Sequence, residues 1–365
     1  MKVAIVHYWL LNMRGGEKVL EALLELFPEA DIFTHVYDPS SVSAAINAHR
    51  VYTSSVGRLP FAKKLYQKYM PLMQDALAEF DLQDYDLVIS SESGPAKGVV
   101  PNPAAFHMCY CHSPMRYLWD MYHEYMRDAG TVTRFFMKSL VPGLRIRDAV
   151  SANLVDHFVA NSSWVAKRIK RCYNREAEIV FPPVSAAAYA ARERKPEDFY
   201  LFFGQLAGYK RADLALEACV SSGRRLVVAG AGAKKKDIKK YEKTGLVHFA
   251  GRVSDDEAAS LYSRARALLF PGVEDFGIVP VEAAAAGCPV IAYRGGGALD
   301  TVKEGITGIF FNEQSAASLA GALARFESAE GSFRNREPFT AHARNFSKEV
   351  FLGRIKSIVE ERARI

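Results

Sequence analysis

The chain has 365 residues, of which 49% are hydrophobic and 24% charged, with a formal net charge of +6. A chain of this length is too long for one compact core and suits two domains. The composition is that of a globular protein. No apolar run reaches the roughly 20 residues that span a bilayer. The five cysteines lack regular spacing, which argues against a disulfide framework and fits reduced thiols. Because "MKVAIVHYWLL" runs into "NMRGGEK" rather than a small-residue cleavage site, a cytoplasmic location is expected.

Short β-rich runs alternate with helical runs in the first half of the chain. "GGEKVLEALLELF" (15–27) has the apolar spacing of an amphipathic helix, and "SWVAKRIKRCY" (163–173) is a second helix that Ser162 or Ser163 could cap. Strands are expected at 2–8, 30–37, 85–92, 105–112 and 156–162. Residues 1–180 are therefore predicted to form a first Rossmann-like domain.

A proline-rich and alanine-rich segment at 181–197 interrupts this pattern and is predicted to be a linker. A second domain is expected at 198–340, and a C-terminal helix at 341–365 is expected to pack back on the first domain. The second domain's strands are predicted at 200–205, 224–230, 247–251, 267–272 and 289–295, and its helices at 211–222, 233–244, 254–266 and 278–287. Strands alternating with helices of about ten residues predict an α/β fold with doubly wound parallel sheets, which bind ligands at the carboxyl ends of their strands.

Two stretches of the first half combine four cations each with aromatic residues and leucines, and neither contains an acid. They are "RLPFAKKLYQKYMPLM" (58–73) and "TVTRFFMKSLVPGLRIR" (131–147). This composition suits contact with an anionic membrane surface. The alternative is a solvated helix face whose apolar side packs inward. The residues expected at the membrane or acceptor surface are Arg58, Lys63, Lys64, Lys68, Arg134 and Lys138.

Glycines and cations follow the first strand of each predicted domain. Gly15 and Gly16 begin a helix, where backbone amides can approach a phosphate or a sugar, or where the glycines simply form a turn. Gly204 ends a strand, and Lys210 and Arg211 follow at a helix start. A lysine and an arginine there suit a diphosphate, with a solvated helix start as the alternative.

The stretch "PGVEDFGIVPVEAAAAGCPV" (271–290) carries two carboxylates, Glu274 in a predicted loop and Glu282 about one turn into a helix. Eight helical residues span roughly 12 Å, which is the scale of a nucleotide diphosphate sugar. Carboxylates accept hydrogen bonds from vicinal hydroxyls, and amides near residues 276–278 can face phosphates. The two acids are therefore predicted to hold opposite ends of one such ligand.

Metal binding is not expected. "CYCH" (109–112) has no second ligand pair at zinc-site spacing, and "DYD" (84–86) precedes a strand rather than following one. Cys109 and Cys111 are interpreted as buried strand thiols.

Several motifs together resemble those of the large retaining glycosyltransferase family known as group 1 or family 4. They are Glu274-x7-Glu282 with "EAAAAGCPVIA", "GGEKVL", "VANSSWVAKRI", "FAGRVSDDEAASLYSRARALLFPG" and "GGGALDTVKEGITGIFF". The resemblance covers nearly the whole chain and implies the GT-B fold, in which two Rossmann-like domains face each other across a cleft. One departure is Gln205, where most members carry an arginine.

The resemblance implies sugar transfer from a nucleotide donor with retention of configuration and without a metal or other cofactor. Glu274 would bind the donor sugar's hydroxyls, Glu282 the ribose, and Lys210 the departing diphosphate. His112 in "CYCHSPMRYLW" would lie beside the sugar, although a histidine after a strand can also be structural. With His112, Lys210 and Glu274 as catalytic residues, the expected donor contacts are Gly15, Gly16, Gly204, Gln205, Lys210, Arg211, Arg252, Val253, Glu274, Phe276, Gly277, Ile278 and Glu282.

The motifs look most like those of mannosyltransferases that build O-antigen and exopolysaccharide units from GDP-mannose. That implies a lipid-diphosphate-linked sugar as acceptor and a peripheral position at the inner face of the plasma membrane, with no nucleic-acid partner. Three alternatives stay open: a UDP-sugar donor, a nucleotide-sugar epimerase on the same scaffold, and a non-catalytic sugar-nucleotide binding module.

Overall fold

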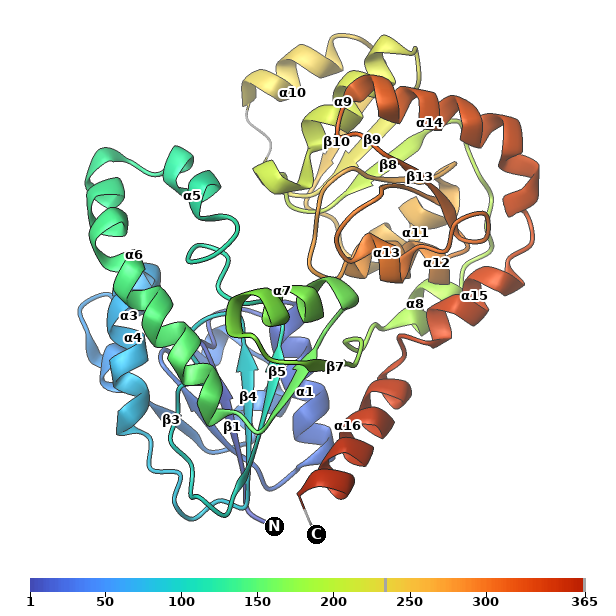
Figure 1. Ribbon diagram of the computed structural model, residues 1–365. Coiled ribbons are helices and arrows are strands. Elements are labelled where there is room, and N and C mark those ends of the chain that lie inside the picture. Colours follow the sequence, from blue (N-terminus) through green and yellow to red (C-terminus); the bar gives the residue numbers. More distant parts are fainter. Residues whose placement is uncertain (233–234, 364–365) are drawn as a thin grey trace. The chain divides into compact units, whose positions relative to one another are not determined.

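The computed structural model describes residues 1–232 and 235–363 (Figure 1). Its contacts divide the chain into two units: Met1–Pro183 together with the segment from Phe351 onward, and Val184–Val350. Each unit is built on one parallel sheet, so the expected class of two doubly wound α/β domains is confirmed. In the described part of the chain, no helix has the length and apolar character that crossing a bilayer requires.

The first unit contains a seven-stranded sheet in the order β3-β2-β1-β4-β5-β6-β7, with every pair parallel. Its strands are β1 (Val3–His7), β2 (Asp31–Thr34), β3 (Val51–Thr53), β4 (Leu87–Glu92), β5 (Phe106–Cys111), β6 (His157–Ala160) and β7 (Ala177–Ile179). The strand order reverses between β1 and β4, and the carboxyl ends of strands at such a point are where this fold binds ligands.

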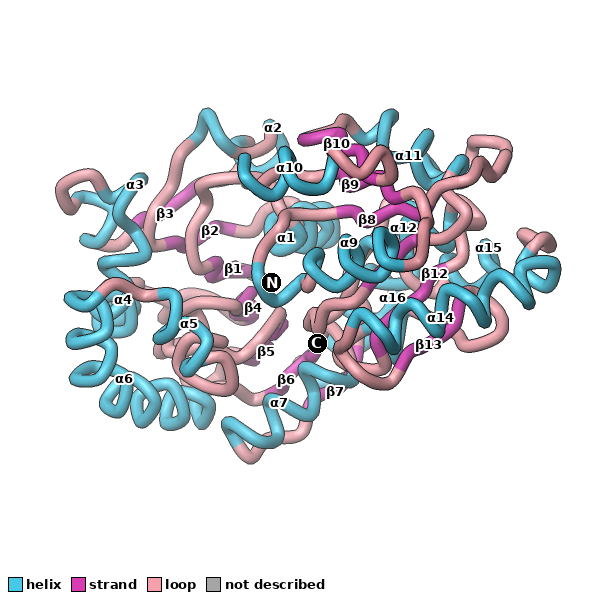
Figure 2. The backbone as a smooth tube through the Cα atoms, turned by 90° about the horizontal axis from the view of Figure 1, so that it is seen from above, coloured by secondary structure: helices cyan, strands magenta, loops and turns pink. Residues whose placement is uncertain are grey.

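Alternating side chains of these strands face two different helix layers. Ile5 and Tyr110 belong to a buried cluster with α1 and α16, whereas Cys109 and Phe158 pack against α7 on the other face. Figure 2 shows the strands in a row with α1 and α16 on one side and α6 and α7 on the other. The helices of this unit are α1 (Gly15–Leu26), α2 (Ala44–Asn47), α3 (Ala62–Leu65), α4 (Met70–Ala76), α5 (Tyr122–Asp128), α6 (Thr131–Ser151), α7 (Ser163–Tyr173) and α16 (Lys348–Arg362).

The bounds of α7 follow from its capping residues. Ser162 is the N-cap, because its Oγ accepts a hydrogen bond of 3.1 Å from the Val165 amide. Asn174 ends the helix in the left-handed conformation, with φ of 54°. Of the two serines proposed as caps, the structure therefore uses the first.

The second unit contains a six-stranded sheet in the order β10-β9-β8-β11-β12-β13, which again reverses at its middle pair. Its strands are β8 (Tyr200–Phe203), β9 (Leu226–Ala229), β10 (Val247–Gly251), β11 (Leu268–Phe270), β12 (Val290–Tyr293) and β13 (Gly308–Phe311). Its helices are α8 (Ala186–Ala190), α9 (Ala212–Ser221), α10 (Lys235–Glu242), α11 (Asp255–Arg264), α12 (Ile278–Ala285), α13 (Ala298–Thr301), α14 (Ala316–Ala329) and α15 (Glu337–Arg344). Positions 233 and 234 of the helix expected at 233–244 lie outside the described residues.

Two expectations about the segments around the second unit need correction. Most of the expected linker at 181–197 belongs to that unit, because α8 buries Tyr189, 7% exposed, in its core. The C-terminal helix expected within 341–365 is α16, whereas residues 341–344 of that range belong to α15. Phe346, between the two helices, is buried and contacts Phe276 and His342 of the second unit. From Phe351 onward, α16 lies in the first unit, where Phe351 packs on Tyr110.

Candidate functional site

An ion pair lies at the carboxyl ends of the two central strands of the second unit. Lys210 closes a short turn after β8, and Glu274 lies in the loop after β11. Because β8 and β11 are neighbours in the sheet, the two loops meet, and Lys210 Nζ lies 2.9 Å from Glu274 Oε1. Both side chains are largely shielded from solvent, at 13% and 18% exposed. The sequence identified both residues, and the structure places them in direct contact.

Two glycines allow the loops around this ion pair to pack closely against each other. A Cβ atom at Gly272 would lie 2.7 Å from the Lys210 Cα, and one at Gly297 would lie 2.2 Å from the Phe276 carbonyl oxygen. Gly297 also donates its backbone N–H to the Glu274 carbonyl over 2.8 Å. A side chain at Gly272 would separate the loops that carry Lys210 and Glu274, and a side chain at Gly297, which follows β12, would displace the loop that carries Glu274 and Phe276.

Glu282 is held by two tyrosines that sequence reasoning did not identify. It lies on α12, whose first turn tolerates Pro280 as expected. Its Oε2 accepts a hydrogen bond of 3.0 Å from the Tyr262 hydroxyl, and Tyr189 also donates to it. Burial, followed by the charge of Glu282, raises the pKa of both tyrosines, which therefore stay protonated hydrogen-bond donors at neutral pH.

The other residues of the second unit that are expected to contact the donor follow β8 and β10 or lie at the starts of α9 and α12. Gly204 has a φ of 135°, and a Cβ there would lie 3.0 Å from Lys210 Nζ, so the ammonium rests against this glycine. Arg211 is the N-cap of α9, and its guanidinium bonds Asp213 at 3.0 to 3.2 Å. Further positions are the exposed Gln205 and Arg252, half-buried Val253, and Phe276, Gly277 and Ile278 at the start of α12.

The first unit gathers polar side chains at the ends of its own central strands. His7 ends β1, Ser91 lies near the end of β4, and His112 follows β5. Ser91 Oγ lies 3.0 Å from His7 Nδ1 and 2.9 Å from His112 Nε2. The His112 backbone is fixed as well, because its N–H donates to the Glu92 carbonyl over 2.8 Å and its carbonyl accepts from Asn161 over 3.0 Å.

The glycine loop after β1 has a packing reason for its second glycine. Gly15 begins α1, and a Cβ at Gly16 would lie 2.3 Å from the Tyr8 hydroxyl. Arg14 is the N-cap, with its backbone N–H donating to Glu17 over 2.9 Å. Gly16 therefore lies in the first turn of α1 and leaves room for the Tyr8 hydroxyl, and contact of either glycine with a donor stays a prediction.

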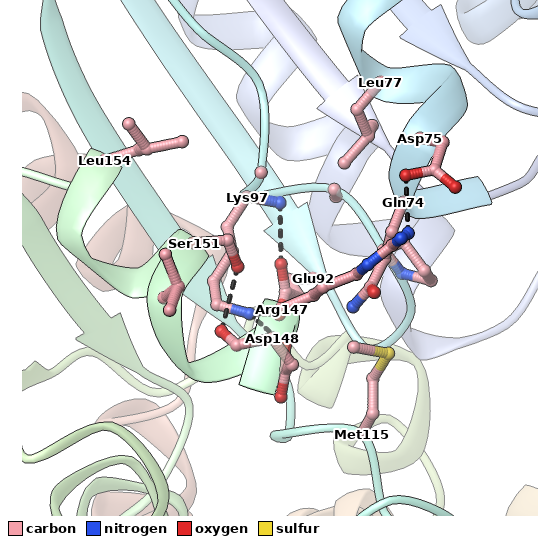
Figure 3. Close-up of a pocket in the computed structure, with 14 residues that line it drawn as sticks. Gln74, Asp75, Leu77, Glu92, Lys97, Met115, Arg147, Asp148, Ser151 and Leu154 are labelled. Atoms are coloured by element: carbon pink, nitrogen blue, oxygen red, sulfur yellow. Dashed lines mark hydrogen bonds and ion pairs between the residues drawn. The ribbon is translucent and has the colours of Figure 1, made fainter. Parts of the chain in front are cut away.

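A buried charge cluster lies below the surface of the first unit, beside a cavity of about 300 Å³ (Figure 3). Lys97 Nζ donates to Glu92 over 2.8 Å and also to Asp148 of α6. Asp148 accepts in addition from the Trp119 indole over 2.6 Å and from the Tyr173 hydroxyl over 3.0 Å. The cluster ties α6 to the end of β4 and was not predicted, because its members come from separate elements.

The residues expected at a membrane surface are exposed. Arg58, Lys64 and Lys68 are solvent-accessible, as is Lys63, which bonds Asp38 over 3.0 Å. Near them Phe61 is 75% exposed and has a left-handed backbone with φ of 53°. On α6, exposed Arg134 and Lys138 are interleaved with the exposed apolar residues Val132, Phe135, Phe136 and Leu140.

Among the residues that the structure describes, no group of three or more metal-ligating side chains could hold an ion. Cys109 and Cys111 are fully buried on β5, as interpreted from the sequence. Burial raises the pKa of the Cys111 thiol well above its ordinary value.

Comparison with known proteins agrees with this fold. The family model for glycosyl transferases group 1 matches residues 188–346. A curated relative, the D-inositol 3-phosphate glycosyltransferase of Acidothermus cellulolyticus, is 29% identical over 219 residues, which cover 50% of this chain and 48% of that protein. The chain thus spans about half the length of the curated relative that it matches.

Solved structures cover nearly the whole chain at low sequence identity. Anabaena Alr3699/HepE in complex with UDP has a TM-score of 0.67 and 14% identity, covering 99% of this chain and 100% of the other. Sucrose-phosphate synthase from Thermosynechococcus elongatus has a TM-score of 0.72 and 17% identity, covering 99% of each chain. These likenesses concern the fold. The family match supports assignment of the second unit to glycosyl transferases group 1.

Proposed function

We propose that this protein is a retaining glycosyltransferase that moves a sugar from a nucleotide diphosphate to an acceptor hydroxyl. The observation that carries the proposal is the Lys210–Glu274 ion pair at the ends of β8 and β11. In the donor, the bond that breaks joins a charged diphosphate to a hydroxylated sugar. A cation that is shielded from solvent can stabilise the diphosphate, and the carboxylate beside it can accept hydrogen bonds from the sugar. The match of residues 188–346 to glycosyl transferases group 1 supports it.

The roles proposed for three residues follow from the chemistry of their side chains. A lysine ammonium has three N–H donors, so Lys210 can keep its bond to Glu274 and also reach a diphosphate oxygen. Glu274 accepts hydrogen bonds from sugar hydroxyls, and Glu282 accepts them from the ribose. The role proposed for His112 at the sugar rests on the resemblance of "CYCHSPMRYLW" to the family motif. Retention follows if the acceptor attacks on the face that the diphosphate leaves, with a phosphate oxygen taking the acceptor's proton. This route needs no covalent sugar on Glu274.

Two donors are proposed. GDP-mannose follows from the resemblance to mannosyltransferases in "FGQLAGYKRADLA" and "CYCHSPMRYLWD", with a lipid-diphosphate-linked sugar as acceptor. A UDP-sugar is the second candidate, because the similar Anabaena protein was solved with UDP and with UDP-glucose.

The test is incubation of purified protein with GDP-mannose or UDP-glucose, with and without a polyprenyl-diphosphate-linked sugar. Mass spectrometry should detect an acceptor enlarged by one hexose and an equivalent amount of released nucleoside diphosphate. An epimerised sugar nucleotide formed from the donor alone would replace the proposal with an epimerase. Nucleotide binding without turnover of any donor would favour the binding module.

We also propose that the exposed face of α6 contacts an anionic membrane, where a lipid-linked acceptor would lie. Replacing Phe135 and Phe136 by aspartate should lower binding to phosphatidylglycerol vesicles at least about tenfold, because two apolar rings are removed and two negative charges added. Sedimentation with vesicles measures this. Val350→Asp, at another exposed apolar position, is the matched control. Equal binding by the double variant and the control would refute the membrane contact.

The tyrosines around Glu282 provide a milder test of the ribose contact. Tyr262→Phe removes one hydrogen bond to the carboxylate without changing the shape of the side chain. Nucleotide affinity should fall about fivefold, which corresponds to the free energy of about 1 kcal/mol that one such hydrogen bond contributes. Tyr200→Phe is the matched control, since Tyr200 donates over 2.8 Å to Glu327, a carboxylate outside the proposed site. Calorimetry with UDP and GDP gives both affinities, and equal affinities in the two variants would contradict the role of Glu282.

A further inference from the structure

His7 is fully buried, and one of its ring nitrogens lacks a hydrogen-bond partner. Nδ1 lies 3.0 Å from Ser91 Oγ, whereas Nε2 has no hydrogen bond and lies 4.0 Å from Glu17 Oε1. Burial, followed by the charge of His112, lowers the pKa of His7 well below its ordinary value, so this imidazole is neutral. It therefore carries one ring proton, on Nδ1 or on Nε2.

The charge of Glu17 selects between these two forms. Burial raises the pKa of Glu17, but the backbone amide and the guanidinium of Arg14 favour its charged form. A proton on His7 Nε2 faces the carboxylate favourably, whereas a lone pair there would face negative charge without a donor. His7 Nδ1 is then an acceptor, and the Ser91 hydroxyl donates to it.

The hydrogen bond from Ser91 to His7 also determines how Ser91 interacts with His112. A serine hydroxyl has a single proton. Because the Ser91 hydroxyl donates its proton in a hydrogen bond to His7, its oxygen can only accept a hydrogen bond from His112 Nε2, which lies 2.9 Å away. Tyr110 and Tyr8 pack edge-on against the His112 ring, with centroids 5.2 and 6.4 Å away, and oppose a ring flip.

We propose that Glu17, His7 and Ser91 form a positioning relay that fixes His112 as the Nε2–H tautomer, so that in the neutral ring only Nδ1 can accept a hydrogen bond or a proton. This proposal deepens the proposed function, on which the role of His112 at the sugar rests. None of the three relay residues needs to touch the substrate.

The tautomer can be measured without any activity. In protein labelled with ¹⁵N-histidine at pH 7.5, long-range ¹H–¹⁵N correlation spectra distinguish the two neutral forms, and His112→Gln identifies the His112 signals. The wild-type protein should contain the Nε2–H form of His112, and Ser91→Ala should give a mixture that Ser91→Thr restores. An Nδ1–H form in the wild type, or no change in Ser91→Ala, would overturn the relay.

A second variant tests the direction of the relay and does not depend on Ser91→Ala folding. Glu17→Gln keeps an oxygen that can accept the Arg14 amide, because glutamine also serves in capping boxes, but it removes the charge. The His112 tautomer should shift toward Nδ1–H in this variant. An unshifted tautomer would show that Glu17 does not set the direction.

The kinetic consequence separates this proposal from the proposed function. Ser91→Ala should lower kcat about five- to tenfold with little change in the donor KM, because one orienting hydrogen bond is lost, and Ser91→Thr should recover most of it. A changed kcat with an unchanged tautomer would reject the relay. The expected tautomers in a wild-type protein that turns over no donor would keep the relay and reject the proposed function.

Discussion

Lys210→Ala should lower kcat for sugar transfer at least about a hundredfold, the usual effect of losing a charged contact made in the transition state. The ammonium is 2.9 Å from Glu274 and is largely shielded from solvent, so no water can replace its charge. Its loss also leaves the Glu274 carboxylate without this cation, which disfavours an anionic leaving group. Initial rates at saturating donor measure the effect.

Two variants identify the source of that loss. Lys210→Met keeps most of the aliphatic side chain and should be as inactive as the alanine variant if charge is what matters. Arg211→Ala removes the neighbouring cation, whose guanidinium forms an ion pair with Asp213. This variant should lower kcat less than tenfold. Near-normal rates in Lys210→Met would remove the lysine from the mechanism.

Lys97→Met should destabilise the first unit by about 3–5 kcal/mol, because it leaves buried carboxylates without their cation. Lys97 lies between Glu92 and Asp148, and all three side chains are buried (Figure 3). The three tryptophans of the chain, Trp9, Trp119 and Trp164, all lie in the first unit. Urea unfolding followed by tryptophan fluorescence therefore reports on this unit.

Arg147 provides a matched control, because it lines the cavity beside the buried cluster but forms a solvent-exposed ion pair. Its partner is Asp75, with 2.5 Å between Arg147 Nη1 and Asp75 Oδ1. Arg147→Met should change the free energy of unfolding by less than about 1 kcal/mol, as exposed pairs do. If Lys97→Met and Arg147→Met lower the free energy of unfolding equally, the buried cluster does not stabilise the first unit more than the exposed ion pair does.

The loss in the free energy of unfolding caused by Lys97→Met should depend on pH. Burial already raises the pKa of Glu92, and without Lys97 its folded-state pKa rises further above the value of about 4 in the unfolded chain. A carboxyl whose pKa is higher in the folded state stabilises when protonated and loses that contribution as pH rises. The loss should therefore be larger at pH 7.5 than at pH 5.

Apolar patterning predicted most of the fold. The central strands of both sheets are nearly continuous apolar runs, which is typical of parallel strands covered on both faces. β3, β7 and β13 were missed; all three lie at the edges of their sheets, and β3 and β7 have only three residues each. Helix α15 was not predicted, and Phe346, which lies between α15 and α16, packs against Phe276.

The candidate site was only partly predictable for a related reason. Glu274, Glu282 and Lys210 lie in recognisable motifs, but their partners come from other elements. Tyr262 has the pattern of an ordinary core residue of α11, and only the structure brings its hydroxyl to Glu282. Ser91 likewise appears as one of two adjacent strand serines, and the register that pairs it with His7 decides its neighbours.

The proposed function requires the second unit to bind an activated sugar along the line from Glu274 to Glu282. The decisive measurement is a crystal structure with a bound nucleotide diphosphate sugar. A phosphate oxygen should lie within hydrogen-bond distance of Lys210 Nζ, with sugar hydroxyls at Glu274 and ribose hydroxyls at Glu282. A nucleotide bound elsewhere on the chain, or both carboxylates turned away from it, would refute the proposed function.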